Sequence, residues 1–295
     1  MKVNIDNSAG FCWGVVRAID FAERELGDKG NLYSLGDIIH NTAEVKRLND
    51  LGLATITVAD FPQLEKGSRV LIRAHGEPPE TYRLAREYGI NLVDATCPVV
   101  SKVQERIKKF YDNGFQVVIY GKKDHAEVVG LNGVIDNNAV IVLSAEEALS
   151  ETDFTRPTVL FSQTTMDREN FARIADALRE KIRELQIGTM EETAVEFHAK
   201  NTICGQVSGR DKKLREFARS NDVIIFVAGK KSSNGKVLYN IAKEENNNIY
   251  FIEDVPEIQK EWFNSAESAG ITGATSTPQW LMVKVKEHIE QLGLA

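Results

Sequence analysis

Three cysteines divide the 295-residue sequence into stretches that resemble one another. Cys12, Cys97 and Cys204 each follow a segment that can form a strand, and each opens a run that can form a helix. A new apolar run then ends on a polar residue 28 residues after each cysteine. These polar residues are His40, His125 and Ser232. Because repetition at a fixed spacing indicates repeated structural units, the sequence predicts a threefold repeat.

Each predicted repeat continues to a second apolar run with a polar end. The second polar ends are His75, Thr164 and Ser276, which lie 63, 67 and 72 residues after their cysteines. An amphipathic helix then closes each repeat, and the drift in spacing is typical of surface insertions. We therefore expect three domains: residues 1–96, residues 97–203, and residues 204–295, the last of which includes the C-terminal helix.

Strand-like and helix-like segments alternate throughout, which predicts an α/β protein with parallel sheets. The segment FQVVIYG is almost continuously apolar, as expected for a parallel strand covered on both faces. Three equivalent α/β units most simply close around a pseudo-threefold axis, as a trefoil. Loops at the carboxyl ends of parallel strands line ligand crevices, so the polar ends are expected to surround one central metal-cluster cavity.

The composition excludes several classes of protein. A formal net charge of −7 argues against a nucleic-acid partner, because phosphate binding needs clustered Lys and Arg. No run of ~18 apolar residues occurs, so no membrane span is expected. The N-terminal segment lacks the apolar core of a secretory signal. Three is an odd number of cysteines, whereas a disulfide framework needs pairs. A cytoplasmic location with reduced thiols is therefore expected.

The cysteines suit a metal centre with one open position. A cysteine at a helix start meets the positive end of the helix dipole and unpaired N–H groups, which favour the thiolate. A zinc ion with three thiolates and a water fits this set, and so does an iron–sulfur cluster with one iron not held by protein. Both sites commonly use closely spaced cysteines, so the long spacings here favour iron–sulfur only slightly. Three small buried core residues are the remaining interpretation.

The polar ends are rich in hydrogen-bond donors, which suits a phosphate or diphosphate ligand. His198 and His288 fall on no polar end and are expected to be ordinary structural residues. Glu127 follows His125 by two residues. It could hold and deliver a proton, or it could be a solvent-exposed glutamate at a helix start. The residues alone favour neither interpretation.

Nine segments resemble the LytB family, in order and over nearly the whole chain. They are FCWGVVRAID, IIHN, RAHGEPPE, DATCPVV, DHAEVVG, SQTT, TIC, SSN and GATSTP. The resemblance implies a trefoil around one 4Fe-4S cluster per chain, held by Cys12, Cys97 and Cys204, with one iron lacking a protein ligand. It also implies an electron donor such as ferredoxin or flavodoxin.

The resemblance further implies the reaction. The allylic hydroxyl oxygen of 4-hydroxy-3-methylbut-2-enyl diphosphate would bind the open iron, and two electrons and two protons would remove it as water. The products would be isopentenyl and dimethylallyl diphosphate, at the last step of the non-mevalonate isoprenoid pathway.

Matching motifs also imply residue roles. Glu127 would be the proton source, oriented through Thr164 and Gln163. The diphosphate-binding residues would be His40, His75, His125, Thr164, Ser232, Ser233, Asn234 and Ser276, with Asn41 beside them. The chain departs from the family pattern after Cys204, where Val207 replaces a threonine and removes one hydroxyl group near the cluster.

Two other functions are compatible with the same residues. A zinc-dependent hydrolase could act on a phosphorylated small molecule, with Glu127 as the base. A non-catalytic iron–sulfur sensor could report redox state to a partner. A sensor does not need a pocket rich in hydrogen-bond donors, so diphosphate binding distinguishes an enzyme from a sensor.

Overall fold

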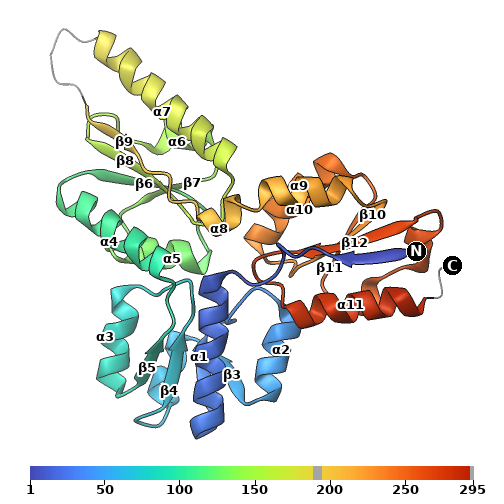
Figure 1. Ribbon diagram of the computed structural model, residues 1–295. Coiled ribbons are helices and arrows are strands. Elements are labelled where there is room, and N and C mark those ends of the chain that lie inside the picture. The colour runs from blue at the N-terminus through green and yellow to red at the C-terminus, as the bar shows by residue number, and fades with distance from the viewer. Residues whose placement is uncertain (189–194, 293–295) are drawn as a thin grey trace. The chain divides into compact units, whose positions relative to one another are not determined.

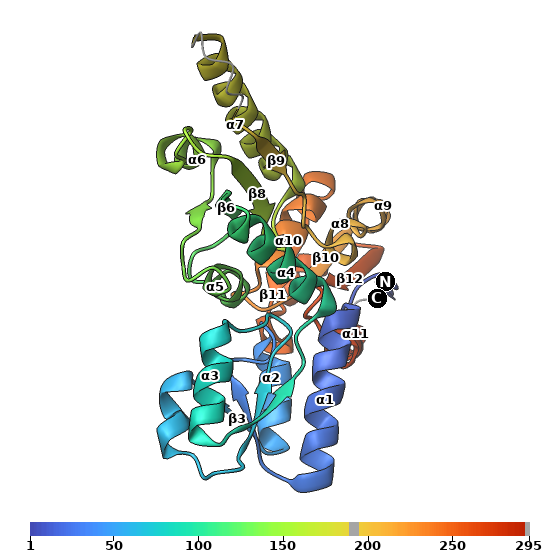
Figure 2. The same ribbon diagram turned by 90° about the vertical axis from the view of Figure 1, so that its left-hand side faces the viewer.

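The computed structural model describes residues 1–188 and 195–292, in which strands and helices alternate (Figure 1 and Figure 2). The strands form three sheets of four, and every pairing with a described register is parallel. The predicted α/β class is therefore confirmed.

The chain divides into two compact units. Unit 1 contains Met1–Thr57, Arg69–Ala74 and the chain from Gly205 onward. Unit 2 contains Val58–Ser68 and His75–Cys204. The three domain boundaries expected from the repeats stay a prediction.

The first sheet has the strand order β3-β2-β4-β5. Its strands are β2 (Leu32–Leu35), β3 (Leu53–Ile56), β4 (Arg69–Ile72) and β5 (Asn91–Asp94). The accompanying helices are α1 (Trp13–Lys29), α2 (Thr42–Asp50), the 3-10 helix η1 (Val58–Gln63) and α3 (Pro79–Tyr88). The strand β4 and the helix α3 are separated by a turn in which Gly76 has a φ of +74°, a conformation that favours glycine. Pro79 then occupies the first helical position, where its missing N–H costs nothing.

The second sheet has the strand order β7-β6-β8-β9. Its strands are β6 (Gln116–Tyr120), β7 (Val140–Val142), β8 (Thr158–Ser162) and β9 (Phe197–Ala199). Its helices are α4 (Pro98–Asp112), α5 (Ala126–Gly133), α6 (Ala145–Glu151) and α7 (Arg168–Gly188). Asp167 caps α7 by accepting a hydrogen bond from the backbone N of Asn170 at 2.8 Å, as its position before the helix predicts.

The third sheet has the strand order β1-β12-β10-β11. Its strands are β1 (Lys2–Ile5), β10 (Val223–Val227), β11 (Ile249–Ile252) and β12 (Ser268–Gly273). Its helices are α8 (Gly205–Ser208), α9 (Asp211–Arg219), α10 (Ser233–Glu245) and α11 (Gln279–Gln291), with the 3-10 helices η2 (Val255–Glu257) and η3 (Lys260–Phe263).

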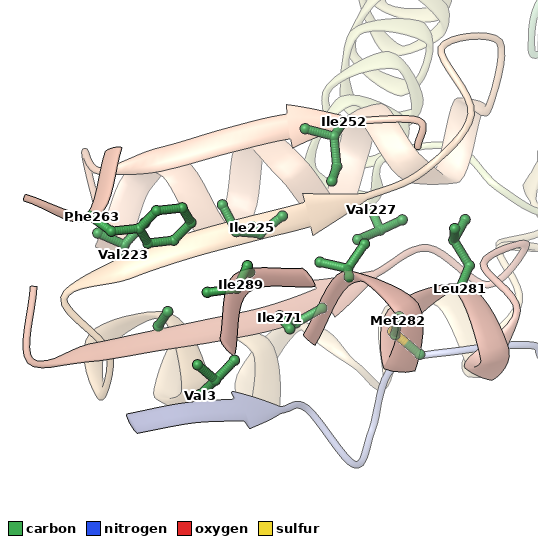
Figure 3. Packing of buried hydrophobic residues seen from close by; sticks show 12 residues of the cluster. Val3, Val223, Ile225, Val227, Ile252, Phe263, Ile271, Leu281, Met282 and Ile289 are labelled. Carbon is green, nitrogen blue, oxygen red and sulfur yellow. The ribbon is translucent and has the colours of Figure 1, made fainter. Parts of the chain in front are cut away.

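Alternation within the buried strands explains how helices cover both faces of a sheet. In β10, Val223, Ile225 and Val227 pack with residues of α11, as Figure 3 shows. The intervening Ile224 and Phe226 pack with residues of α9 and α10. Side chains alternate between the faces of a strand, so a continuous apolar run produces two cores. The segment FQVVIYG behaves in the same way in β6, where Val117 and Ile119 pack in one core and Val118 and Tyr120 in another, so the prediction of a doubly covered strand is confirmed.

The strand before each cysteine is an edge strand of a sheet. The strand before Cys97 is β5, and the strand before Cys204 is β9. The strand before Cys12 is β1, which pairs with β12 near the other end of the chain, with Ile5 opposite Ile271. The N-terminal strand therefore completes the sheet of the third repeat.

Candidate functional site

Each cysteine lies at the start of a helix. Cys12 and Cys97 are the N-cap residues of α1 and α4, and Cys204 directly precedes α8. All three are partly exposed, and none forms a disulfide. Their number, exposure and placement fit a centre that needs three thiolates.

Two of the cysteines make the same backbone hydrogen bond. Cys12 N donates to the carbonyl oxygen of Thr275 at 3.1 Å in unit 1, and Cys204 N donates to that of Thr164 at 2.9 Å in unit 2. Thr275 and Thr164 belong to the loops that carry the second polar ends of their repeats. Two repeats thus attach a cysteine to such a loop in the same way.

The electrostatic setting of Cys97 differs from the expectation at a helix start. Burial raises the pKa of its thiol, whereas the backbone N–H groups of Val99 and Val100 lower it. The charges of Cys204 and Glu127 raise the pKa further. The helix start therefore acts in the expected direction, but burial outweighs it because a charged thiolate loses its hydration.

Glu127 is a buried carboxyl in the first turn of α5, with 2% of its surface exposed. Its Oε1 accepts a hydrogen bond from the backbone N of Thr164 at 2.6 Å, and its Oε2 accepts one from Thr164 Oγ1 at 2.8 Å. Burial raises its pKa to about 7, although both hydrogen bonds lower it. The interpretation of Glu127 as a solvent-exposed helix-cap residue is therefore wrong, because α5 packs this side chain inward.

Two of the predicted histidines contact each other in unit 2, at the start of α5. His125 is the N-cap of α5, and its Nδ1 accepts a hydrogen bond from the backbone N of Glu127 at 3.2 Å. The ring of His75 packs edge-on against the ring of His125, with centroids 5.3 Å apart and planes at 76°. Unit 2 thus brings together two side chains that are 50 residues apart in the sequence.

Gln163 is fully buried and directly precedes Thr164, the residue that bonds to Glu127. Its Oε1 accepts a hydrogen bond from the backbone N of Lys122 at 3.1 Å, and its Nε2 donates to Thr165 Oγ1 at 2.8 Å. These bonds join the loops after β6 and β8. Gln163 therefore holds the loop that contains Thr164, rather than bonding to the carboxylate.

Unit 1 gathers the polar residues of the third repeat. Ser232 caps α10 by accepting from the backbone N of Gly235 at 3.0 Å, and its Oγ lies 3.4 Å from Ser276 Oγ. Ser233 is buried in the first turn of the same helix. A helix N-terminus lined by hydroxyl groups is suited to binding an anion.

Asn234 holds the second loop of this repeat against the first. Its Oδ1 accepts hydrogen bonds from the backbone N and the Oγ1 of Thr275, both at 2.8 Å. Its Nδ2 is buried and has no hydrogen-bond partner among the described residues. Buried polar atoms are seldom left unsatisfied, so this donor suggests a ligand position.

The first polar end of the first repeat also lies in unit 1. Asn41 caps α2 through its Oδ1, which accepts from the backbone N of Glu44 at 3.0 Å, and His40 directly precedes it. A Cβ atom on Gly229 would lie 2.2 Å from the carbonyl oxygen of His40, so this contact requires glycine. The loops after β2 and β10 therefore touch through their backbones.

Sequence reasoning assigned no role to Arg210. Its guanidinium is partly buried, and its Nη1 has no hydrogen-bond partner within the described ranges. Burial lowers its pKa, while the charges of Cys12 and Asp6 raise it. In the sequence, Arg210 is visible only as an arginine six residues after Cys204. Nothing in the sequence indicates that its charge interacts with Cys12. The side chain of Val207 lies outside the described ones.

Comparisons with known proteins cover almost the whole chain. A family model described as LytB protein matches residues 3–290. The 4-hydroxy-3-methylbut-2-enyl diphosphate reductase of Chloroherpeton thalassium is 51% identical, with 98% of this chain and 96% of the relative covered. That of Prosthecochloris aestuarii is 48% identical, with 98% of each covered.

Two solved structures have the same fold. A structure of (E)-4-hydroxy-3-methyl-but-2-enyl diphosphate reductase, described as the terminal enzyme of the non-mevalonate pathway, aligns with a TM-score of 0.72 and 35% identity, covering 99% of this chain and 100% of that one. The E-1-hydroxy-2-methyl-but-2-enyl-4-diphosphate reductase of Plasmodium falciparum aligns with a TM-score of 0.83 and 25% identity, covering 96% and 86%. In the part of the chain that the structure describes, no helix is long and apolar enough to cross a membrane.

Proposed function

The chain belongs to the LytB family, and we propose that it is a 4-hydroxy-3-methylbut-2-enyl diphosphate reductase that produces isopentenyl and dimethylallyl diphosphate. In this reaction the allylic C–O bond breaks, two electrons and two protons are consumed, and water leaves. The relatives named for this activity support the reductase rather than the zinc-dependent hydrolase or the redox sensor.

The observation that carries the proposal is the connection of Glu127 to Cys204 through Thr164. The N–H and hydroxyl of Thr164 donate to the carboxylate, and its carbonyl oxygen accepts from Cys204 N. A carboxyl with a pKa of about 7 can carry a proton at neutral pH, as a general acid must. Two hydrogen bonds therefore link the carboxyl of Glu127, through Thr164, to the backbone of Cys204, which supports Glu127 as the proton source.

Cys12, Cys97 and Cys204 would hold a 4Fe-4S cluster, one per chain, with one iron lacking a protein ligand. When bound, this cluster would supply the electrons of the reaction. The electrons would come from a one-electron carrier such as ferredoxin or flavodoxin. Three reduced thiols suit the cytoplasm, which we propose as the location of the enzyme.

The diphosphate would be bound by the polar residues at the strand ends. In unit 1 these are His40, Ser232, Ser233, Asn234 and Ser276, with Asn41 holding the loop of His40. In unit 2 they are His75, His125 and Thr164. Neutral hydroxyls, amide N–H groups and helix N-termini bind an anion without requiring net positive charge, which is compatible with the acidic composition of the chain.

Glu127 would protonate the substrate as the C–O bond breaks or as the allyl product forms. Its burial raises its pKa to about 7, so a large share of the carboxyl carries a proton at neutral pH, and the two bonds from Thr164 fix its direction. His125 is already engaged as the N-cap of α5, so it is less able to deliver the proton itself.

The test is anaerobic reconstitution followed by turnover with a chemical reductant. The reductase is expected to be brown, to contain iron and sulfide, and to convert the allylic diphosphate to the two isoprenoid products. A colourless zinc protein that releases phosphate would contradict the proposal and support a hydrolase. An iron–sulfur protein that does not bind the diphosphate would support a sensor.

A further inference from the structure

A second buried carboxylate, Glu44, lies in unit 1 and has no role in the reaction proposed above. Only 1% of its surface is exposed, although it belongs to the first turn of α2. Its carboxylate accepts hydrogen bonds from Arg47 Nε at 3.0 Å, Arg47 Nη2 at 2.6 Å and Trp280 Nε1 at 2.6 Å. Burying a charged group is costly unless it is paired, and here three donors satisfy it.

The partners of Glu44 connect three helices. Arg47 lies one turn further along α2 and also donates to Glu23 of α1 at 2.6 Å. Trp280 lies in the first turn of α11, and its bond to Glu44 joins residues 236 positions apart. The hydrogen bond from Trp280 to this carboxylate therefore links the start of α2 to the start of α11.

Both helix starts carry residues that we assign to diphosphate binding. The backbone N of Glu44 donates to Asn41, the cap of α2, and His40 is the preceding residue. Trp280 follows Ser276 by four residues, across the turn that begins α11. A shift of α2 relative to α11 would thus change the position of His40 relative to Ser276.

The packing around Trp280 does not fix it by itself. Its side chain is 39% exposed, and it lines a groove of about 540 Å³ together with Phe11, Val16 and Ile19. A ring in so open a setting is held less by dense packing than by its hydrogen bond to the buried carboxylate. The bond is therefore the specific constraint on this contact.

We propose that Glu44 is a positioning residue that aligns the diphosphate-binding loops of His40 and Ser276 through its bond to Trp280. The proposal rests on the diphosphate-binding function proposed above. It adds residues that do not touch the ligand and act through its binding loops. The backbone contact between Gly229 and His40 supports the same loop from another direction, so loss of the bond loosens the site without abolishing it.

The experiment compares Trp280→Phe, Glu44→Gln and the double variant with the wild type. Trp280→Phe keeps an aromatic ring but removes the Nε1 donor, and it alters a partly exposed position. Glu44→Gln keeps the shape but removes the charge paired with Arg47 and leaves one acceptor oxygen for three donors. The matched control is Glu80→Gln on α3, where Arg83 pairs with Glu80 in the same way but both side chains are more than half exposed.

Two quantities are measured on the anaerobic holoenzyme. One is the dissociation constant of inorganic diphosphate and of the allylic substrate. The other is the turnover rate at saturating substrate. Each single variant is expected to bind both ligands roughly three- to tenfold more weakly, a typical coupling through a side-chain network. The rate at saturation, the cluster spectrum and the Glu80→Gln control are expected to be unchanged.

The double variant tests the route of the effect. If Glu44 and Trp280 act through one bond, the double variant binds no more weakly than the weaker single variant, because the second change has nothing left to remove. Wild-type affinity in both single variants would overturn the proposal, as would a lower melting temperature with unchanged affinity. Failure of the wild type to bind either diphosphate would instead contradict the proposed function itself.

Discussion

At the residue scale, the decisive feature is a single carboxyl whose surroundings change its chemistry. Glu127 is buried and accepts both of its hydrogen bonds from one residue, Thr164. Desolvation favours the neutral acid, while two donors favour the carboxylate. Because desolvation is the larger effect, the pKa rises to about 7, and the proton remains available at neutral pH.

The variant Glu127→Gln is expected to separate the chemical step from binding. Glutamine keeps the shape and one of the two acceptor oxygens for Thr164 but cannot act as a general acid, so turnover should fall by about 10²–10⁴. Substrate affinity and the cluster spectrum should be retained. Glu146→Gln provides the control, because Glu146 occupies the first turn of α6 but is exposed. Wild-type turnover in Glu127→Gln would assign the proton to another group.

The same carboxyl predicts a pH dependence of stability. Its pKa is higher in the folded chain than the ordinary value of 4.5, so folding favours the protonated form. The contribution is present below pH 4.5 and is lost as the pH rises through about 7. It amounts to roughly 3 kcal/mol. Denaturant unfolding of the cluster-free protein should show this loss in the wild type and not in Glu127→Gln, and parallel curves would contradict it.

At the element scale, many of the predicted site residues lie at the N-termini of helices. Cys12 and Cys97 cap α1 and α4, His125 caps α5, and Ser232 caps α10. Each of these helices follows a strand of a parallel sheet. Within each sheet the carboxyl ends of the strands lie at one edge, which is where ligand-binding loops gather. The unpaired N–H groups at a helix start can donate hydrogen bonds to a thiolate or to a phosphate. The same feature of a helix can therefore stabilise both kinds of anion.

The start of α10 provides a test of anion binding. Asn234→Asp keeps the acceptor used by Thr275 but replaces the buried Nδ2 donor with a negatively charged oxygen. Loss of a hydrogen bond to a charged ligand alone should weaken diphosphate binding about tenfold or more. The control Asn264→Asp adds the same charge at an exposed position of unit 1. Equal affinity in both variants would exclude Asn234 from the site.

At the scale of the whole molecule, one cysteine follows an edge strand of each sheet. The strands β1, β5 and β9 precede Cys12, Cys97 and Cys204, and each lies at an edge in its strand order. The sequence contains no fourth cysteine. The proposed 4Fe-4S cluster would therefore take one ligand from each of the three predicted repeats.

Single Cys→Ser variants are expected to show that all three cysteines are ligands of the proposed cluster. After anaerobic reconstitution, the iron and sulfide content per chain should fall in Cys12→Ser, Cys97→Ser and Cys204→Ser alike, because no spare thiol can replace the lost one. Activity should fall with it. A full, stable and active cluster in any one variant would show that its cysteine is not a ligand.

The sequence by itself determined the parts whose causes are local. The repeat of three cysteines, the doubly buried strands, Pro98 at the start of α4 and the cap at Asp167 all follow from residue types and spacing. These features depend on neighbours a few residues away, since capping, backbone restriction and hydrophobic alternation act over a turn or a strand. For the same reason the motifs were sufficient to indicate the family.

Only the tertiary structure decided which distant residues share an environment. It paired β1 with β12, so that Asp6 Oδ2 accepts a hydrogen bond from Thr272 Oγ1 at 2.8 Å across 266 positions. It buried Glu127 and Glu44, although glutamates in the first turn of a helix are often exposed, as Glu146 is. Burial depends on what packs above a residue, and that partner leaves no trace in the local pattern. The burial of Glu127, which the residues alone left open, and the bond from Glu44 to Trp280 therefore became evident only from the folded chain.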